Sequence, residues 1–284
     1  MIRLAVRVAR EDAPSALAEL LVFSPAGVEE IDGEEGTIEY VLYGAPGELP
    51  TLPALRASVG DALVDVSTSE IADDWSSRWR SFHQPIEIAH TLRVRPPWCE
   101  PASGSDLIDL VIEPGQAFGT GSHATTRLCL ELLVELASTG EAAGPLLDLG
   151  TGSGVLAIAA AKLGFSPVAG VDHELESVQA ALENARANGV SIELHRLDLR
   201  VDELPSAPTV TANLLRPLLL ELADRLRTPP ALLIASGLLS DQADEVAATF
   251  MDRHGMRERA RRDDGDWSAL LLEGIPNRRI LWPR

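Results

Sequence analysis

The glycine-rich segment at 148–154 is the part of the sequence best suited to hold a nucleotide-like ligand. It reads Asp-Leu-Gly-Thr-Gly-Ser-Gly, follows an apolar stretch and opens a predicted helix at 154–163. Glycines let the backbone approach a ligand without a Cβ clash, and a helix N-terminus presents free N–H groups. A dinucleotide fingerprint needs GxGxxG, but Val155 stands where its third glycine would fall. The GxGxG spacing therefore argues against a dehydrogenase.

The same spacing, with an acid two residues before the first glycine, resembles the first motif of S-adenosylmethionine-dependent enzymes. Gly150 and Gly152 are then the cofactor-binding positions of the loop. Asp172 follows the next predicted strand, 22 residues beyond Gly150, where a carboxylate can accept both ribose hydroxyls. Its alternative role is to cap the helix that begins near Glu174.

Two more polar side chains follow predicted strands further along the chain. Asp198 comes after strand 191–197 and can accept the adenine amino group; alternatively, it is a cap or a solvated side chain. Asn213 ends strand 209–213, and ligands of open α/β sheets bind outside the carboxyl ends of the strands. We therefore expect Asn213 at the reacting end of the cofactor, the alternative being a polar cap before Pro217.

From residue 124 onward, predicted helices and strands alternate regularly. This alternation predicts a doubly wound α/β domain with a mostly parallel sheet. The end of the chain instead indicates an antiparallel edge hairpin, 256–262 with 267–273, so we expect the seven-stranded sheet of a class I methyltransferase. The expected helices are 124–137, 154–163, 174–188, 217–227 and 240–254, and the expected strands are 145–149, 167–171, 191–197, 209–213 and 231–235.

The N-terminal part of the chain has a separate pattern. Residues 1–60 contain predicted strands at 2–8 and 36–43 and a helix at 13–22, which indicates a small α+β domain for substrate recognition. Residues 61–85 are expected to form a linker with a short helix, and 86–284 the methyltransferase domain. Trp75 and Trp79 lie one turn apart in that helix, which favours a packed stripe over a substrate platform.

The segment 114–126 carries a far more specific signal than the glycine loop. It reads PGQAFGTGSHATT and resembles the hallmark PGxAFGTGxHxTT segment of the PrmA family, bacterial methyltransferases that modify large-subunit ribosomal protein L11. The resemblance covers about residues 70–273, including Asn213 and the Ser-Gly-Leu-Leu segment at 236–239, whereas 1–60 match only in length and pattern. One departure is Ala124, where the family often has Pro.

Carried over by position, the resemblance implies cofactor contacts from Thr126, Gly150, Asp172 and Asn213. Phe118 lies in the Gly-rich hallmark segment and is expected to cover the active site, so we group it with Asn213 as a candidate catalytic residue. His123 can be imagined as a general base, but a single His beside glycines and threonines is more often a structural hydrogen-bonding residue.

The amino-acid composition limits the classes of partner that the chain is expected to bind. The chain carries 24 basic and 43 acidic residues, a net charge of −19, which repels a nucleic-acid backbone and attracts a basic partner. Residues 1–60 alone have a net charge of −6. Cys99 and Cys129 stand alone, so we expect no metal site, no disulfide and a reducing cytoplasm. No apolar stretch reaches the 18 or so residues needed to span a membrane, and we expect a monomer.

These observations predict an enzyme that transfers methyl groups from S-adenosylmethionine to amino groups of a basic ribosomal protein. Lysine side chains, the N-terminal amine or both are the expected acceptors, and L11 is the substrate that the resemblance implies. The alternatives are a related protein-lysine or small-molecule methyltransferase and a non-catalytic cofactor-binding module. The hallmark segment and Asn213 argue against the last, since a pure sensor needs neither.

Overall fold

The computed structural model describes most of the chain, in two compact units, Met1–His83 and Gln84–Arg284. Trp75, Trp79 and the helix expected around them lie outside the described residues, as does Phe118. Within the expected helix 13–22, the described positions 13, 16, 17 and 20 are helical. The described residues are 2–13, 16–17, 20, 28–33, 36–44, 49–50, 52–70, 83–101, 104, 106–114, 119 and 121–274.

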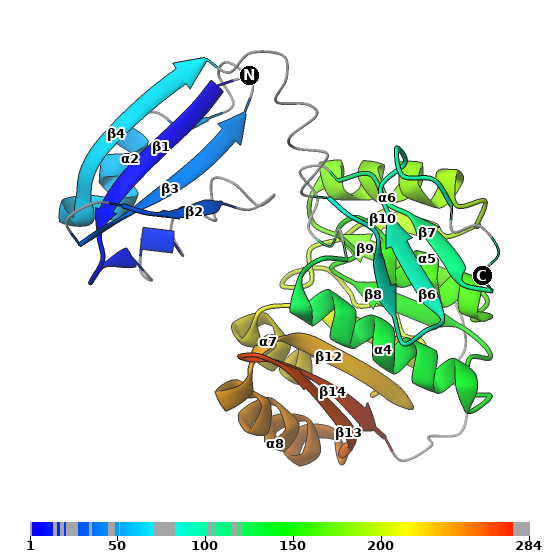
Figure 1. Cartoon of the computed structure of the whole chain (residues 1–284). Helices are drawn as coiled ribbons and strands as arrows, with labels where there is room; N and C mark the ends of the chain where they lie inside the picture. The colour runs from blue at the N-terminus through cyan, green and yellow to red at the C-terminus, as the bar shows by residue number, and fades with distance from the viewer. Residues whose placement is uncertain are drawn as a thin grey trace. The chain divides into compact units, whose positions relative to one another are not determined.

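The first unit is an antiparallel sheet with its own core. Its strands lie in the order β2-β3-β1-β4 (Figure 1). Leu4, Val6 and Val8 alternate along β1, so their side chains share one face of the sheet and pack with Leu20 and Leu55. The elements are β1 (Ile2–Ala9), β2 (Glu29–Asp32), β3 (Thr37–Gly44), α2 (Leu52–Val59), the 3-10 turn η1 (Gly60–Ala62) and β4 (Leu63–Glu70).

Strand β4 corrects the domain boundary expected near residue 60. It pairs with β1 along its length, with Val66 opposite Val6, so the first unit continues through part of the range expected to be a linker. Strand β1 would otherwise be an unpaired sheet edge, because β3 occupies only its other side. The second unit accordingly begins at Gln84.

The second unit is built on a seven-stranded sheet in the order β10-β9-β8-β11-β12-β14-β13, in which only β14 and β13 run antiparallel to their neighbours (Figure 1). The doubly wound prediction and the edge hairpin are both confirmed. The strands of this sheet are β8 (Leu146–Leu149), β9 (Val168–Asp172), β10 (Glu193–Arg196), β11 (Thr209–Asn213), β12 (Leu232–Leu239), β13 (Arg257–Asp264) and β14 (Trp267–Glu273).

Helices cover both faces of this sheet, so its central strands are buried along their length. Every residue of β8 and β9 is buried, as expected of parallel strands between two helical layers. Side chains of α4 and α5 belong to one core, and those of α7 and α8 to a second core. The helices are α4 (Ala124–Ser138), α5 (Val155–Leu163), α6 (Leu175–Ala187), α7 (Arg216–Arg225), the 3-10 turn η2 (Ser240–Gln242) and α8 (Ala243–His254).

The second unit begins with a three-stranded sheet, which packs into the same apolar core as α4 and α5. It consists of β5 (Ile86–Ile88), β6 (Leu92–Arg95) and β7 (Ile108–Val111), in that order. Among the helices that the structure describes, none is long and apolar enough to cross a membrane.

Candidate active site

Strand order fixes where a ligand can bind. The chain passes from β8 to β9 on one side of β8, and later returns to β11 on its other side. In open α/β sheets, a reversal of this kind places the ligand crevice outside the carboxyl ends of the strands. The glycine loop follows β8, Asp172 ends β9 and Asn213 ends β11, so three predicted site segments meet at one edge.

The glycine loop turns sharply at the end of β8. Gly150, Gly152 and Gly154 all have positive φ, at 72°, 52° and 82°, a backbone region that glycine enters without a Cβ penalty. The amide N–H groups of Gly150 and Thr151 both donate to the carbonyl of Val171 at 2.9 Å. The loop is therefore anchored against the end of β9, at the N-terminus of α5.

Asp172 is almost fully buried beside this loop. Its Oδ2 accepts a hydrogen bond from Gly152 N at 2.9 Å, and its Oδ1 accepts one from Glu174 N at 3.1 Å. The second bond is local and goes to Glu174, which is itself the N-cap of α6; no described side chain caps that helix, so Asp172 does not have the capping role considered from the sequence. A carboxylate oxygen has more than one lone pair, so each oxygen can still accept a hydroxyl.

Asp148 supports the loop from within the sheet. It is completely buried, and it accepts hydrogen bonds from Thr151 Oγ1 at 2.7 Å and Thr211 Oγ1 at 2.6 Å. Burial raises the pKa of Asp148 to about 6, against the two hydroxyl donors, which lower it. The side chain thereby ties β8, the glycine loop and β11 together.

Asp148 should make unfolding stability depend on pH. Its pKa is raised in the folded state, from 3.8 to about 6, so the native chain binds more protons in that window and stability falls as pH rises through it. The loss is about 3 kcal/mol, complete near pH 6 to 7. In Asp148→Asn this contribution is absent. Denaturant unfolding from pH 4 to 8 measures the free energy of unfolding of both proteins. If it varied with pH in the same way in both, Asp148 would not be the source of the pH dependence.

Asn213 and Thr126 meet across the crevice. Asn213 Nδ2 donates to Thr126 Oγ1 at 3.4 Å, which joins the end of β11 to the first turn of α4. Thr126 is completely buried. Among the described residues, Asn213 Oδ1 is buried and has no hydrogen-bond partner. An unpaired buried acceptor costs free energy, so it marks a place where a ligand N–H group can bind.

His123 has the structural role favoured from the sequence. It is the N-cap of α4, and its ring accepts a hydrogen bond from Thr125 N at 3.3 Å. Burial and the nearby Arg127 lower the pKa of His123 below its ordinary value, which favours the neutral ring. The ring also packs edge-on against Trp267, with centroids 4.8 Å apart.

Sequence reasoning missed two residues that assemble the site. Ser153 Oγ donates to the carbonyl of Gly119 at 2.6 Å and thereby attaches the hallmark segment to the glycine loop. Asn184, on α6, donates from Nδ2 to Ser153 O at 2.9 Å and accepts from Glu113 N at 3.0 Å. The only advance signal for Ser153 was its place inside the glycine loop, and Asn184 had none.

Asp198 lies in a different setting from the other predicted residues. It is part-exposed, and both carboxylate oxygens contact Arg200, at 2.9 and 3.0 Å. Hydrogen bonds from the side chain and backbone of Arg200 lower the pKa of Asp198 to about 2. Asp198 also accepts from Arg200 N at 2.9 Å, which closes a local turn; the next described helix begins only at Arg216, so Asp198 does not cap a helix. The adenine contact stays a prediction, and an adenine amino group would share an oxygen that Arg200 already uses.

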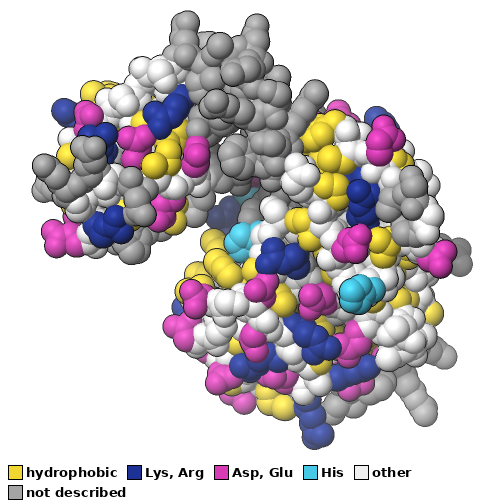
Figure 2. Space-filling model, in the orientation of Figure 1, with side chains coloured by type: hydrophobic (Ala, Val, Ile, Leu, Met, Phe, Trp, Pro, Cys, Tyr) yellow, Lys and Arg dark blue, Asp and Glu magenta, His cyan; other side chains and the backbone are white. Residues whose placement is uncertain are grey.

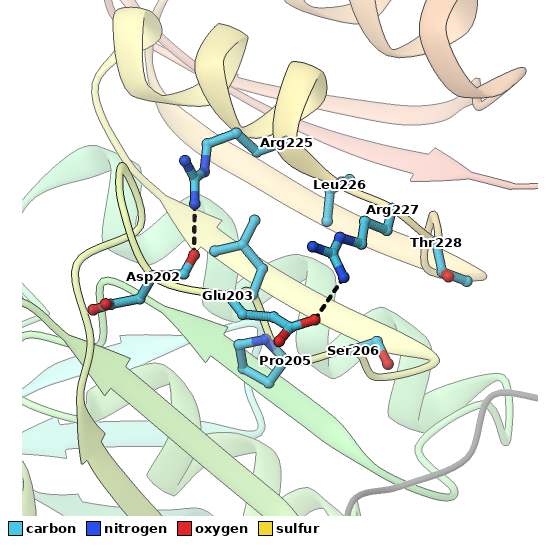
Figure 3. Close-up of a pocket in the computed structure, with 9 residues that line it drawn as sticks. Asp202, Glu203, Pro205, Ser206, Arg225, Leu226, Arg227 and Thr228 are labelled. Carbon is cyan, nitrogen blue, oxygen red and sulfur yellow. Dashed lines mark hydrogen bonds and ion pairs between the residues drawn. The ribbon is translucent and has the colours of Figure 1, made fainter.

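A polar cavity of about 410 Å³ lies at the opposite end of the strands, near the amino ends of β11 and β12 (Figure 3). Its walls are the loop 202–206, which leads into β11, and the segment 225–228, which leads into β12. Arg227 and Glu203 form an ion pair there at 2.7 Å. Because it adjoins the amino ends of these strands, this cavity is separate from the crevice that holds the glycine loop.

Comparison with known proteins decides the family. The family model described as ribosomal protein L11 methyltransferase (PrmA) matches residues 51–274. The chain belongs to the PrmA family. Ribosomal protein L11 methyltransferases of Geobacter metallireducens and Caldanaerobacter subterraneus are 41% and 33% identical to it, over 71% and 78% of this chain. The matched parts span 66% and 71% of those relatives, and 60% of the Citrifermentans bemidjiense relative, which is 39% identical over 63% of this chain.

A solved structure of a ribosomal protein L11 methylase agrees with the fold. The ribosomal protein L11 methylase of Lactobacillus delbrueckii is 29% identical, with a TM-score of 0.60, over 68% of this chain and 98% of that chain. The class I methyltransferase fold predicted from the sequence is therefore confirmed. Residues 1–50 lie outside the PrmA family match.

Proposed function

We propose that this chain transfers methyl groups from S-adenosylmethionine to amino groups of a basic ribosomal protein, L11. Family membership supports the reaction class, and one structural observation carries the assignment of the acceptor site. That observation is the buried Oδ1 of Asn213 at the carboxyl end of β11, which has no hydrogen-bond partner among the residues that the structure describes. Incubation of L11 with the protein and S-adenosylmethionine, followed by mass spectrometry, tests the proposal: whole-methyl mass increments are expected, and unmodified L11 would contradict it.

The residues at the crevice fit S-adenosylmethionine. The loop from Gly150 to Gly154 turns at three glycines with positive φ, so its backbone passes around the end of β8 without a Cβ penalty. Asp172 retains acceptor capacity for the ribose hydroxyls, and Thr126 and Asn213 lie at the other end of the crevice. When bound, the cofactor supplies a methyl group on a positively charged sulfur that is already an activated leaving group.

The protein's task is then to bind and orient the acceptor amine. In-line displacement depends on placing the nitrogen opposite the leaving sulfur, and such positioning supplies much of the rate. A free lysine has a pKa near 10.4, so the site must favour the neutral amine. Asn213 Oδ1 can accept an N–H of that amine and turn its lone pair toward the methyl group, and a low-polarity surrounding disfavours the charged form. No general base is required.

Charge favours a basic protein substrate. The first unit, residues 1–83, carries 15 acidic and 6 basic side chains. Acidic and basic side chains are mixed over the face shown in Figure 2. On this face the excess negative charge therefore attracts a basic protein through its long-range field, and not through one acidic patch. We infer that the first unit recognises the ribosomal protein, and that the reaction takes place in the cytoplasm, where such substrates are made.

Asp172→Ala tests the cofactor site. Loss of the charge-assisted hydrogen bonds to the ribose should weaken S-adenosylmethionine binding by about 1.5–3 kcal/mol. Asp172 belongs to neither apolar core, so we expect the variant to fold although the amide of Gly152 loses its acceptor. Calorimetric titration measures the affinity, with Asp198→Ala as a comparison that we expect to have a smaller effect, because Arg200 already occupies its carboxylate. Wild-type affinity in folded Asp172→Ala would exclude Asp172 from the site.

A further inference from the structure

Gly237 lies in a bulge of β12, at a point where this strand contacts the turn that follows Asn213. The pairing of β12 with β14 shifts register between Ala235 and Leu238, so Ser236 and Gly237 occupy an irregular step of the strand. Gly237 has a φ of 85°, in the left-handed region that glycine accepts. A glycine inside a strand commonly marks a bulge or a close backbone approach, and both are present here.

The backbone that approaches Gly237 belongs to Leu214, the residue after Asn213. A Cβ atom at position 237 would clash with the carbonyl oxygen of Leu214 and lie 2.7 Å from its carbonyl carbon and 3.0 Å from its nitrogen. Leu214 N also donates a hydrogen bond to Ser236 O at 2.9 Å. The bulge therefore fixes the peptide that follows Asn213 by direct backbone contact. Because the atoms that a Cβ would meet belong to the backbone, no side-chain rotation could relieve the clash.

The same turn is restrained from its other side. A Cβ atom at Gly150 would lie 2.5 Å from Leu214 Cδ2, so the Leu214 side chain rests against the glycine loop. Ser236 Oγ donates to the carbonyl of Ser268 at 3.0 Å and holds the bulge on β14. Leu214 is thus set between the cofactor loop and the bulge, and the position of Asn213 follows from both.

We propose that Gly237 is a positioning residue for the acceptor amine: by admitting the Leu214 backbone, it places Asn213 Oδ1 at the reacting end of the site. This inference rests on the proposed methyl transfer. Two hydrogen bonds hold the glycine loop without involving Leu214. Gly152 N donates to Asp172 Oδ2, and Ser153 Oγ donates to the carbonyl of Gly119. A shift of the turn should therefore change turnover more than cofactor binding.

Gly237→Ala is the test, and Gly144→Ala is its matched control. Gly144 has a φ of 86°, nearly that of Gly237, but a Cβ atom there would have nothing within 4 Å. Both variants therefore introduce similar backbone strain, and only Gly237→Ala introduces the clash. We expect kcat for L11 methylation to fall about 100-fold in Gly237→Ala, as a displacement near 1 Å can cause, and to stay within about threefold of wild type in Gly144→Ala. S-adenosylmethionine affinity should change by less than about threefold in both.

A spectroscopic measurement makes the test independent of turnover. In protein selectively labelled with ¹⁵N-asparagine, the side-chain amide signal of Asn213, assigned by its loss in Asn213→Ala, should move in Gly237→Ala and stay in place in Gly144→Ala. An unmoved Asn213 signal, or unchanged kcat in Gly237→Ala, would overturn the inference. If wild-type protein fails to methylate L11, the proposed function fails, while the Asn213 signal still decides the role of Gly237.

Gly237→Asn covers the case in which Gly237→Ala does not fold. Asn tolerates positive φ better than Ala, so this variant introduces the same Cβ with less backbone strain. We expect it to fold and to reproduce the loss of turnover and the shift of the Asn213 signal. If both Gly237 variants fail to fold while Gly144→Ala folds, Gly237 is a residue of the fold and the positioning role is wrong.

Discussion

Deletion of residues 1–83 should reduce L11 methylation by at least about 100-fold in kcat/KM and leave S-adenosylmethionine binding intact. Among the described residues, the two units have separate cores, since the buried cluster of the first unit and the residues packed against it all lie between Leu4 and Val66. The second unit should therefore fold alone and retain the glycine loop, Asp172 and Asn213. The basic substrate would lose its docking surface and the effective concentration that docking provides.

The cut belongs after residue 83, because a cut at 60 would leave β4 without its partner β1. Calorimetry with S-adenosylmethionine and circular dichroism show whether the truncated chain is folded and binds cofactor. Added salt should reproduce part of the defect in the intact chain, by raising the apparent KM for L11. A folded, cofactor-binding truncated chain that methylates L11 as well as the intact chain would refute the recognition role.

Asn213→Ala should lower kcat by about 100-fold and change cofactor affinity much less. The variant removes the one buried oxygen at the site that lacks a partner among the described residues, and with it the acceptor that orients the amine. Asn213→Asp is the matched variant. It keeps an oxygen at this position but loses the Nδ2 donor to Thr126, so it should retain more turnover than the Ala variant.

Steady-state kinetics on L11, with calorimetry on S-adenosylmethionine, separates the two effects in the Asn213 variants. Normal kcat in Asn213→Ala would reject its role in orienting the amine. Loss of cofactor binding equal to the loss of turnover would instead place Asn213 on the cofactor alone.

Much of the second unit was predictable because its pattern is local. The strand expected at 209–213 is β11, and the helix expected at 124–137 is α4, which ends one residue later, at Ser138. Periodicity and glycine spacing report which residues are buried along one element. They also placed the glycine loop, Asp172 and Asn213 at strand ends, which the topology then brought to one edge of the sheet.

Other features depend on contacts between distant segments, which local patterns do not encode. The strand β4 belongs to the first sheet because it pairs with β1, about sixty positions away in the chain. The bonds from Ser153 to Gly119 and from Asn184 to Ser153 join residues more than 30 positions apart. All the cofactor contacts predicted from the sequence stay predictions, as do the catalytic roles of Asn213 and Phe118; the predicted contacts are Thr126, Gly150, Gly152, Asp172, Asp198 and Asn213.

The most direct test of the central claim is a labelling experiment on whole ribosomal proteins. Ribosomal proteins from cells that lack the enzyme are incubated with the intact chain and S-adenosylmethionine labelled in its methyl group, and the labelled band is identified by mass spectrometry. We predict that L11 carries the label on amino groups, and that Asn213→Ala leaves the band nearly unlabelled. Label on another protein, on nucleic acid or on nothing at all would contradict the account.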